Sequence, residues 1–268
     1  MIRVHHLNGL TMCPWFGRHL LNERGCMVCH CLLLETPRGL ILVDTALGTD
    51  DVRNPSRRIG RGFTWMTRPR LSLDDTIVAQ IERRGFSRAD VRHVVLTHLD
   101  LDHAGGIADF PEAAVHCSTV EHDAATRPRT LVERERYKPA QWAHGPRLVL
   151  HPSGSGERWN GFEAVRCVDD EPDVLLVPLS GHTRGHCGVA VRTGDGWLLH
   201  AGDAYFHRAE MAPEPACPFA LDRFQRILAV DGEARVHNQG RLRDLVKSGA
   251  AMVFSAHDPD ELARFSDR

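Results

Sequence analysis

Apolar residues gather along this chain in short runs bounded by glycine, proline and charged side chains. Runs with this pattern predict strands at 1–7, 27–35, 40–45, 94–96, 114–117, 175–177, 188–192, 197–200 and 252–255. Apolar residues that recur every three or four positions predict helices at 73–84, from about 119 onward, at 221–230 and at 235–247. Ser72 would cap the first of these helices and Gly85 would end it. The chain therefore alternates strands with helices, which is typical of an α/β fold.

The two halves of the chain echo each other weakly. Gly39–Asp44 and Gly196–Asp203 each place an aspartate at the end of an apolar strand. The segments at 96–106 and 179–188 are also similar, because each has histidines and glycines directly after an apolar strand. This echo suggests two sheets stacked face to face with helices outside, their strand ends converging on one edge.

Two segments depart from the regular pattern and are predicted to be lid-like insertions in a single domain that spans 1–268. They cover 48–72 and 122–161 and are rich in arginine, proline and glycine. Their large apolar side chains would line a substrate pocket or pin down the loops; they are Phe63, Trp65, Met66, Tyr137 and Trp142.

Composition narrows the possible partners. The chain has 268 residues, of which 33 are Lys or Arg and 35 are Asp or Glu, so its net charge is −2. This balance gives no reason to expect nucleic acid or a membrane as partner, and we expect a small-molecule substrate. The N-terminal residues lack the apolar core of a secretory signal, which predicts a cytoplasmic protein. The oligomeric state stays open, a homodimer included.

The eight cysteines are too sparse for a disulfide framework. Cys26, Cys29 and Cys31 superficially resemble half of a zinc ribbon, but no second cysteine pair stands at the required spacing. Because the segment continues as an apolar strand, we interpret these cysteines as core thiols.

Four potential metal ligands follow the apolar run Val94–Leu96 within six positions: His98, Asp100, Asp102 and His103. So many imidazoles and carboxylates in one place are costly unless a cation or a hydrogen-bond network holds them together. The 17 histidines of the chain also favour metal chemistry over a solvated acidic turn. The sequence therefore predicts a metal site here.

Three further candidates stand in the same setting, a strand end followed by a tight turn. They are His182, Asp203 and His257. Taken singly, each fits an ordinary polar turn residue. Their order after the dense cluster favours a shared metal centre.

With these motifs in order from Asp44 to His257, the chain resembles the metallo-β-lactamase superfamily of metal-dependent hydrolases. The resemblance implies a four-layer αβ/βα sandwich with a two-metal site at one edge. It implies that His98, Asp100 and His182 bind the first metal, that Asp102, His103 and His257 bind the second, and that Asp203 bridges them. Asp44 would support the metal loop, and we expect His186 to support its own loop through hydrogen bonds.

Asp100 departs from the superfamily pattern, which has histidine at this position. Carboxylate oxygen is a harder ligand than imidazole, so the site should tolerate iron or manganese better than an all-histidine one. Asp100 binds the metal directly, binds it through a water, or lies behind the ligands without binding it. Zinc is the first expectation for the two divalent ions, with iron or manganese as the alternative.

The resemblance favours hydrolysis of a small ester-like substrate, most of all a lactone. A metal-activated hydroxide would attack the carbonyl, and Asp102 would carry its proton to the leaving group. Tyr205 resembles the tyrosine that binds the lactone carbonyl in N-acyl-homoserine lactonases, although it stands one residue closer to Asp203. The alternative is that Tyr205 packs in the core. Thioester, phosphodiester or β-lactam hydrolysis, a di-iron oxidoreductase or dioxygenase, and a non-catalytic metal scaffold remain as alternatives.

Overall fold

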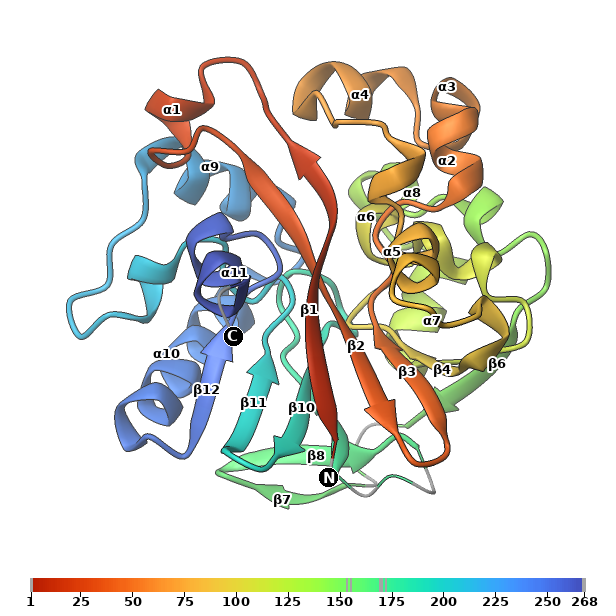
Figure 1. Ribbon diagram of the computed structural model, residues 1–268. Coiled ribbons are helices and arrows are strands. Elements are labelled where there is room, and N and C mark those ends of the chain that lie inside the picture. The colour runs from red at the N-terminus through yellow and green to blue at the C-terminus, as the bar shows by residue number, and fades with distance from the viewer. Residues whose placement is uncertain (1, 153, 155, 169–170, 172, 267–268) are drawn as a thin grey trace.

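The computed structural model describes residues 2–152, 154, 156–168, 171 and 173–266, and it contains two mixed sheets (Figure 1). The first sheet holds, in order of neighbouring strands, β1 (Arg3–Met12), β2 (Met27–Thr36), β3 (Gly39–Val43), β4 (Val91–Val95), β5 (Ala114–Ser118) and β6 (Arg147–His151). The second holds β12 (Ala251–Phe254), β11 (Gly196–His200), β10 (Cys187–Thr193), β9 (Val174–Pro178), β8 (Phe162–Arg166) and β7 (Glu157–Trp159).

The sheets have related topologies, as the internal echo predicts. In the first, β1–β3 are antiparallel and β3–β6 are parallel. In the second, β11 and β12 are parallel and the other pairings are antiparallel. The parallel strands β3 and β4 end at one sheet edge, and β11 and β12 end at the equivalent edge of the other sheet.

Alternation along the strands divides the core into layers. On β2, Leu32 and Leu34 face the second sheet, where they pack with residues such as Leu176 and Val189. Leu33, on the opposite face, belongs to the core cluster beneath the helices that cover the first sheet. Side chains of a strand alternate between faces, so one strand serves two apolar layers.

Helices cover the outer faces of both sheets (Figure 1). α5 (Ile77–Arg83) and α7 (Thr119–Thr126) pack on the first sheet, and α10 (Gly232–Ser248) packs on β12 of the second. The remaining helices are α1 (Gly17–Leu20), α2 (Thr49–Arg53), α3 (Pro55–Arg58), α4 (Arg61–Thr67), α6 (Leu101–Ala104), α8 (Leu131–Arg136), α9 (Phe219–Leu228) and α11 (Pro259–Ser266). Short 3₁₀ turns occur at Leu73–Asp75, Arg88–Asp90, Gly105–Asp109, Pro139–Gln141 and Arg208–Met211. This arrangement confirms the predicted four-layer αβ/βα sandwich.

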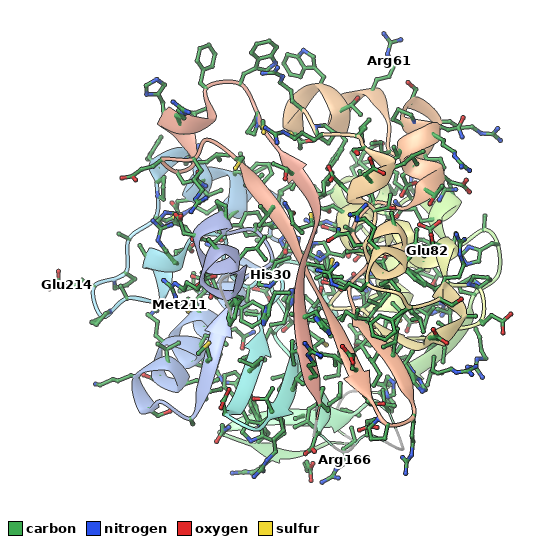
Figure 2. The ribbon with its side chains drawn as sticks, viewed as in Figure 1. His30, Arg61, Glu82, Arg166, Met211 and Glu214 are labelled. Carbon is green, nitrogen blue, oxygen red and sulfur yellow. The ribbon has the colours of Figure 1, made fainter. Side chains whose placement is uncertain are left out.

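Many charged side chains on the outer helices and loops point into solvent. His30 lies in the interior, whereas Arg61, Glu82 and Glu214 point outward (Figure 2). No helix among the described residues is both long and apolar enough to cross a membrane.

Three departures from the predicted elements concern the first helix and the two lid segments. The helix predicted at 73–84 starts only at Ile77, because Thr76 and not Ser72 accepts the capping hydrogen bond from Ala79 N. The segment 48–72, expected to be irregular, contains α2, α3 and α4. Within 122–161, β6 extends the first sheet and β7 extends the second, so only part of this segment has the form of a lid.

Candidate metal centre

Five strand ends deliver the polar residues of the site. Asp44 follows β3, and the segment from His98 to His103 follows β4. His182, Asp203 and His257 come after β9, β11 and β12. Because these strands end at the same edge of the sandwich, side chains far apart in sequence lie close together.

His98, Asp100 and His182 form the first group of potential ligands. Asp100 Oδ2 lies 3.4 Å from His98 Nε2 and 3.1 Å from His182 Nε2. All three donor atoms lie within 4.8 Å of one another, which is the spacing of ligands around a single cation.

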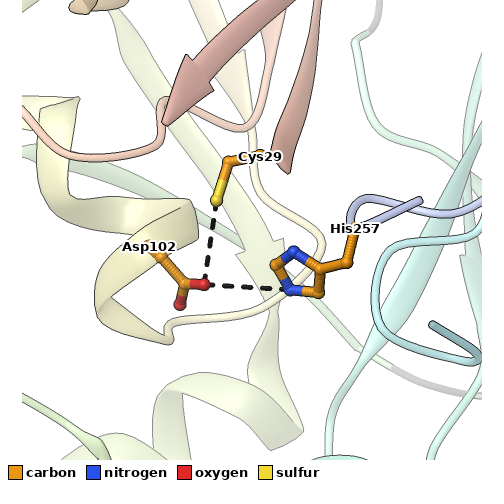
Figure 3. A group of neighbouring side chains, drawn as sticks. All are labelled: Cys29, Asp102 and His257. Carbon is orange, nitrogen blue, oxygen red and sulfur yellow. Dashed lines mark hydrogen bonds and ion pairs between the residues drawn. The ribbon is translucent and has the colours of Figure 1, made fainter. Parts of the chain in front are cut away.

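Asp102 and His257 form a second group with Cys29, which comes from β2. Asp102 Oδ2 lies 3.8 Å from His257 Nε2 and 3.8 Å from Cys29 Sγ. Figure 3 shows the thiol and the imidazole both directed at the carboxylate of Asp102. The sequence predicts a core thiol at Cys29, so this contact with Asp102 is unexpected.

Asp203 lies between the two groups. Its Oδ2 is 3.4 Å from His182 Nε2 and 3.1 Å from His257 Nε2. Its Oδ1 is 3.2 Å from His103 Nε2, and His98, His103 and Asp203 form a third compact group. The structure thus brings all seven predicted ligands together and gives Asp203 the central position.

The donor set fits metal ions. Within the described part of the chain, several buried polar atoms of the site make no hydrogen bond, namely His98 Nε2, Asp100 Oδ1, His103 Nε2 and Asp203 Oδ1. Buried polar atoms without a partner cost free energy, and coordination to a cation removes that cost. The nitrogen and oxygen donors are those that zinc, iron and manganese take in proteins.

Negative charge dominates this buried volume. Burial alone would lower the pKa of His103, but the carboxylates of Asp203 and Asp44 hold that pKa well above its ordinary value. Burial would also lower the pKa of His257, but Asp203 raises that pKa above its ordinary value. Groups that stabilise a protonated imidazole so strongly also stabilise a bound cation.

Residues behind the ligands fix their orientation. Asp44 accepts hydrogen bonds of 2.8 Å from Thr97 N and Thr97 Oγ1, and its Oδ2 lies 2.8 Å from His103 Nδ1. Its backbone is left-handed, with φ of 57°. A carboxylate behind an imidazole orients the ring and increases its basicity. Asp44 therefore has the supporting position expected for it.

His186 also supports the site from behind. Its Nδ1 lies 2.9 Å from Leu179 O, and its Nε2 accepts a 2.9 Å hydrogen bond from Asp203 N. A Cβ atom at Gly202, where φ is +54°, would lie 2.6 Å from His186 Nε2. Only glycine fits there, so His186 and Gly202 together set the turn that carries Asp203.

Glu121, in α7, is a buried anchor that the sequence analysis did not identify. Its Oε1 accepts hydrogen bonds from Leu99 N and Tyr137 Oη, both at 3.0 Å. Its Oε2 accepts from Thr183 Oγ1 at 2.7 Å and from Gly185 N at 3.1 Å. One carboxylate therefore joins the loop of His98 to the loop of His182.

Arg136, at the end of α8, is a second unexpected neighbour. Its Nη1 lies 2.7 Å from both Asp100 Oδ2 and His182 Nε2, and its Nη2 donates to Leu228 O. Burial alone would raise the pKa of Asp100, but the guanidinium together with His98 and His182 holds that pKa well below its usual range. It thus balances the charge that Asp100 adds to the first group.

A cavity of about 630 Å³ opens onto these ligands. Asp100, Asp102, His182, Asp203 and His257 form its polar floor. Its walls are mainly apolar and include Met12, Ile59, Phe63, Met66, Leu131, Phe206, Phe224 and Ile227. Residues of both 48–72 and 122–161 contribute to these walls.

Three of the predicted pocket residues lie elsewhere. Trp65 is 73% exposed on α4. Tyr137 is buried with its hydroxyl on Glu121, and Trp142 packs against the core beside the first sheet. Tyr137 and Trp142 hold the loops in place, which is the alternative that the sequence left open, whereas the Trp65 ring faces solvent.

The structure places Tyr205 in the core, which is the alternative to a contact with substrate. Its ring is fully buried in the core of the second sheet, and its hydroxyl lies 3.0 and 3.2 Å from the two carboxylate oxygens of Glu261. Its neighbour Phe206 lines the cavity instead. The chain turns directly after Asp203, so the one-residue offset from the lactonase tyrosine is enough to direct the Tyr205 side chain away from the cavity.

Comparison with known proteins decides the family. The profile of the Metallo-beta-lactamase superfamily matches residues 24–257. The chain belongs to the metallo-β-lactamase superfamily. In this superfamily of hydrolases it is 43% identical over 268 residues to a probable metallo-hydrolase of Mycobacterium tuberculosis, covering 98% of this chain and 83% of that protein.

Lactonases are also among the similar superfamily members. An N-acyl homoserine lactonase of Bacillus thuringiensis is 28% identical over 233 residues, which cover 86% of this chain and 81% of that enzyme. The solved structure of an N-acyl homoserine lactone hydrolase, with the product N-hexanoyl-L-homoserine at its catalytic metal centre, matches with a TM-score of 0.73. That match covers 97% of this chain and 95% of the other at 22% identity, and it shows the shared fold.

Proposed function

We propose that this metallo-β-lactamase-fold hydrolase opens a small lactone at a centre of two divalent metal ions. The observation that carries the proposal is the cluster of seven potential ligands on the floor of an apolar cavity. Similarity to proteins named N-acyl homoserine lactonase supports the choice of substrate.

Two neighbouring positions would hold the ions. His98, Asp100 and His182 would bind the first, Asp102, His103 and His257 the second, and Asp203 both. When bound, such ions supply an activated water and stabilise the negative charge that develops on the attacked carbonyl oxygen.

Asp102 is the residue we assign to proton transfer. Its carboxylate borders the cavity, and the Cys29 thiol donates to its Oδ2 over 3.8 Å. A carboxylate in this position accepts the proton of the attacking water and returns it to the leaving oxygen of the opened ring.

The shape of the cavity indicates the kind of substrate. Its polar floor suits an ester-like group, and its long apolar wall suits an attached acyl chain. Burial of each methylene of such a chain contributes about 0.8 kcal/mol to binding. We therefore infer a preference for lactones with an acyl chain over the unsubstituted ring.

Zinc is the ion we propose. Asp100 in place of histidine leaves iron or manganese as the alternative, and bound iron would support a di-iron oxidoreductase instead. Oxygen-dependent turnover by iron-loaded protein is the result that would favour that second function.

One activity panel tests the proposal. Protein of known metal content is assayed on lactones, thioesters, phosphodiesters and a β-lactam, with oxygen uptake measured in parallel. We expect lactones to have the highest kcat/KM. Higher kcat/KM for another substrate, or oxygen-dependent turnover alone, would refute the lactonase assignment.

The variants Asp102→Ala and His257→Ala test the centre itself. Each should abolish lactone turnover, while circular dichroism shows a retained fold. Glu112→Gln changes an exposed carboxylate that belongs neither to the ligand groups nor to the cavity lining, so it is the matched control and should keep full activity. Full activity in either alanine variant would remove the mechanism.

A further inference from the structure

Cys29 is a buried thiol whose position the mechanism above does not require. Its Sγ lies 3.8 Å from Asp102 Oδ2, and it is 1% exposed. The donor atoms of Cys29, Asp102 and His257 all lie within 4.8 Å of one another (Figure 3). Ligands of a tetrahedral zinc with one Zn–S bond of about 2.3 Å and Zn–N or Zn–O bonds of about 2.0 Å stand roughly 3.5 Å apart. The observed spacing is close to that value.

The fold fixes the thiol beside His257. The backbone at the start of β2 is hydrogen-bonded to the loop after β12, with Val28 N donating to His257 O at 3.3 Å and His30 N to Ala256 O at 2.9 Å. His257 Nδ1 in turn lies 2.7 Å from Val28 O. These contacts flank Cys29 on both sides, so its side chain and the His257 ring cannot separate without breaking them.

We propose that Cys29 is a further ligand of the second metal ion, in addition to Asp102, His103, His257 and Asp203. This inference rests on the metal centre of the proposed function. On binding, the S–H bond of Cys29 breaks, a sulfur–metal bond forms, and the proton leaves to solvent. The second position then has a sulfur donor, while the first has nitrogen and oxygen donors only.

A sulfur donor has a consequence for metal choice. Thiolate is a soft ligand, which zinc, cobalt and cadmium bind well and manganese and magnesium bind poorly. The hard carboxylate of Asp100 works in the opposite direction at the first position. The two positions should therefore differ in the metal they prefer.

The alternative is a thiol that stays protonated and donates to the Asp102 carboxylate. Cobalt(II) distinguishes the two, because a thiolate bound to cobalt gives an intense near-ultraviolet charge-transfer absorption. We expect this absorption in the cobalt-loaded wild type and in Cys31→Ser, and its loss in Cys29→Ser. Cys31 is the matched control, since it is buried on the same strand and the same face two residues away.

X-ray absorption of the zinc-loaded wild type needs no variant. We expect a sulfur neighbour at about 2.3 Å, on average half a sulfur per zinc when both positions are filled. Bound zinc with only nitrogen and oxygen neighbours would overturn the role of Cys29 and leave the proposed function intact. Failure to bind zinc or cobalt at all would overturn both.

Discussion

Replacing Glu121 by glutamine tests how far one buried side chain holds the site together. The carboxylate accepts four hydrogen bonds, two on each oxygen. On each oxygen one donor is a hydroxyl, from Tyr137 or Thr183, and the other is a backbone N–H, from Leu99 or Gly185. A glutamine amide offers only one acceptor oxygen, so its NH₂ group must face one of the two pairs.

The expected cost follows from that geometry. The hydroxyl that faces the NH₂ can rotate and become an acceptor, but the backbone N–H cannot. In either orientation of the amide, one buried N–H loses its partner, which costs roughly 1–3 kcal/mol. The remaining bonds lose their charged acceptor, and the smaller penalty for burying a neutral group offsets part of that loss. We expect the free energy of unfolding to fall by about 2 kcal/mol.

Urea unfolding at a fixed free metal concentration measures this change. With an m-value of about 2 kcal/mol per molar urea, the midpoint should fall by roughly 1 M. Because Glu121 joins the loops of His98 and His182, metal retention against a chelator should fall in parallel. The exposed Glu112→Gln is the control. A Glu121→Gln midpoint equal to that of the wild type would show that these hydrogen bonds do not stabilise the fold.

Three further changes have distinct outcomes. Tyr205→Phe should lower the free energy of unfolding by about 1–2 kcal/mol and leave KM unchanged, because the hydroxyl contacts Glu261 inside the core. A changed KM with unchanged stability would contradict a core role for Tyr205. Burial raises the pKa of Glu261 from 4.5 to about 7, so the folded state holds this proton more tightly than the unfolded state. The contribution of Glu261 to the stability of the chelated protein should therefore decline by roughly 3 kcal/mol between about pH 4.5 and 7. In urea titrations, the difference in unfolding free energy between the wild type and Glu261→Gln should show this decline, because the two proteins share all other titrating groups, including buried histidines such as His116, whose lowered pKa acts in the opposite direction. Arg136→Gln removes a cation beside Asp100, so it should increase the affinity for the first metal about tenfold, as measured by competition with a chelator. The control Arg134→Gln, which changes an exposed arginine of the same helix, should leave this affinity unchanged. Weaker metal binding in Arg136→Gln would contradict our interpretation.

Much of the architecture could be predicted because its determinants are local. Apolar runs such as Leu40–Val43 and Leu198–His200 identify strands, and the polar residues directly after them mark the sheet edge where the site forms. Asp44, Asp203 and His257 could be proposed on this basis, because residues within a few positions of a strand end lie at the edge of the sheet where that strand stops. Once the dense cluster from His98 to His103 indicated a metal site, the later strand ends could be searched for the remaining ligands.

Unlike Asp44 and His186, the site neighbours Glu121, Arg136 and Cys29 could not be predicted, because no local pattern distinguishes them. Glu121 is one acid in an ordinary helix, and Arg136 is one of several arginines in a polar segment. Cys29 lies on an apolar strand where a thiol is normally core. Each reaches the centre only through contacts across the fold, and those depend on how the helices and sheets pack.

The ligand set is divided between the two halves of the polypeptide. His98 to His103 follow a strand of one sheet, whereas His182, Asp203 and His257 follow strands of the other. An ion held by both halves acts as a reversible cross-link between them. At a hundredfold excess over its dissociation constant, such an ion adds about 2.7 kcal/mol to stability. The thermal resistance of this enzyme is therefore set by the supply of metal in its surroundings as well as by its amino-acid sequence.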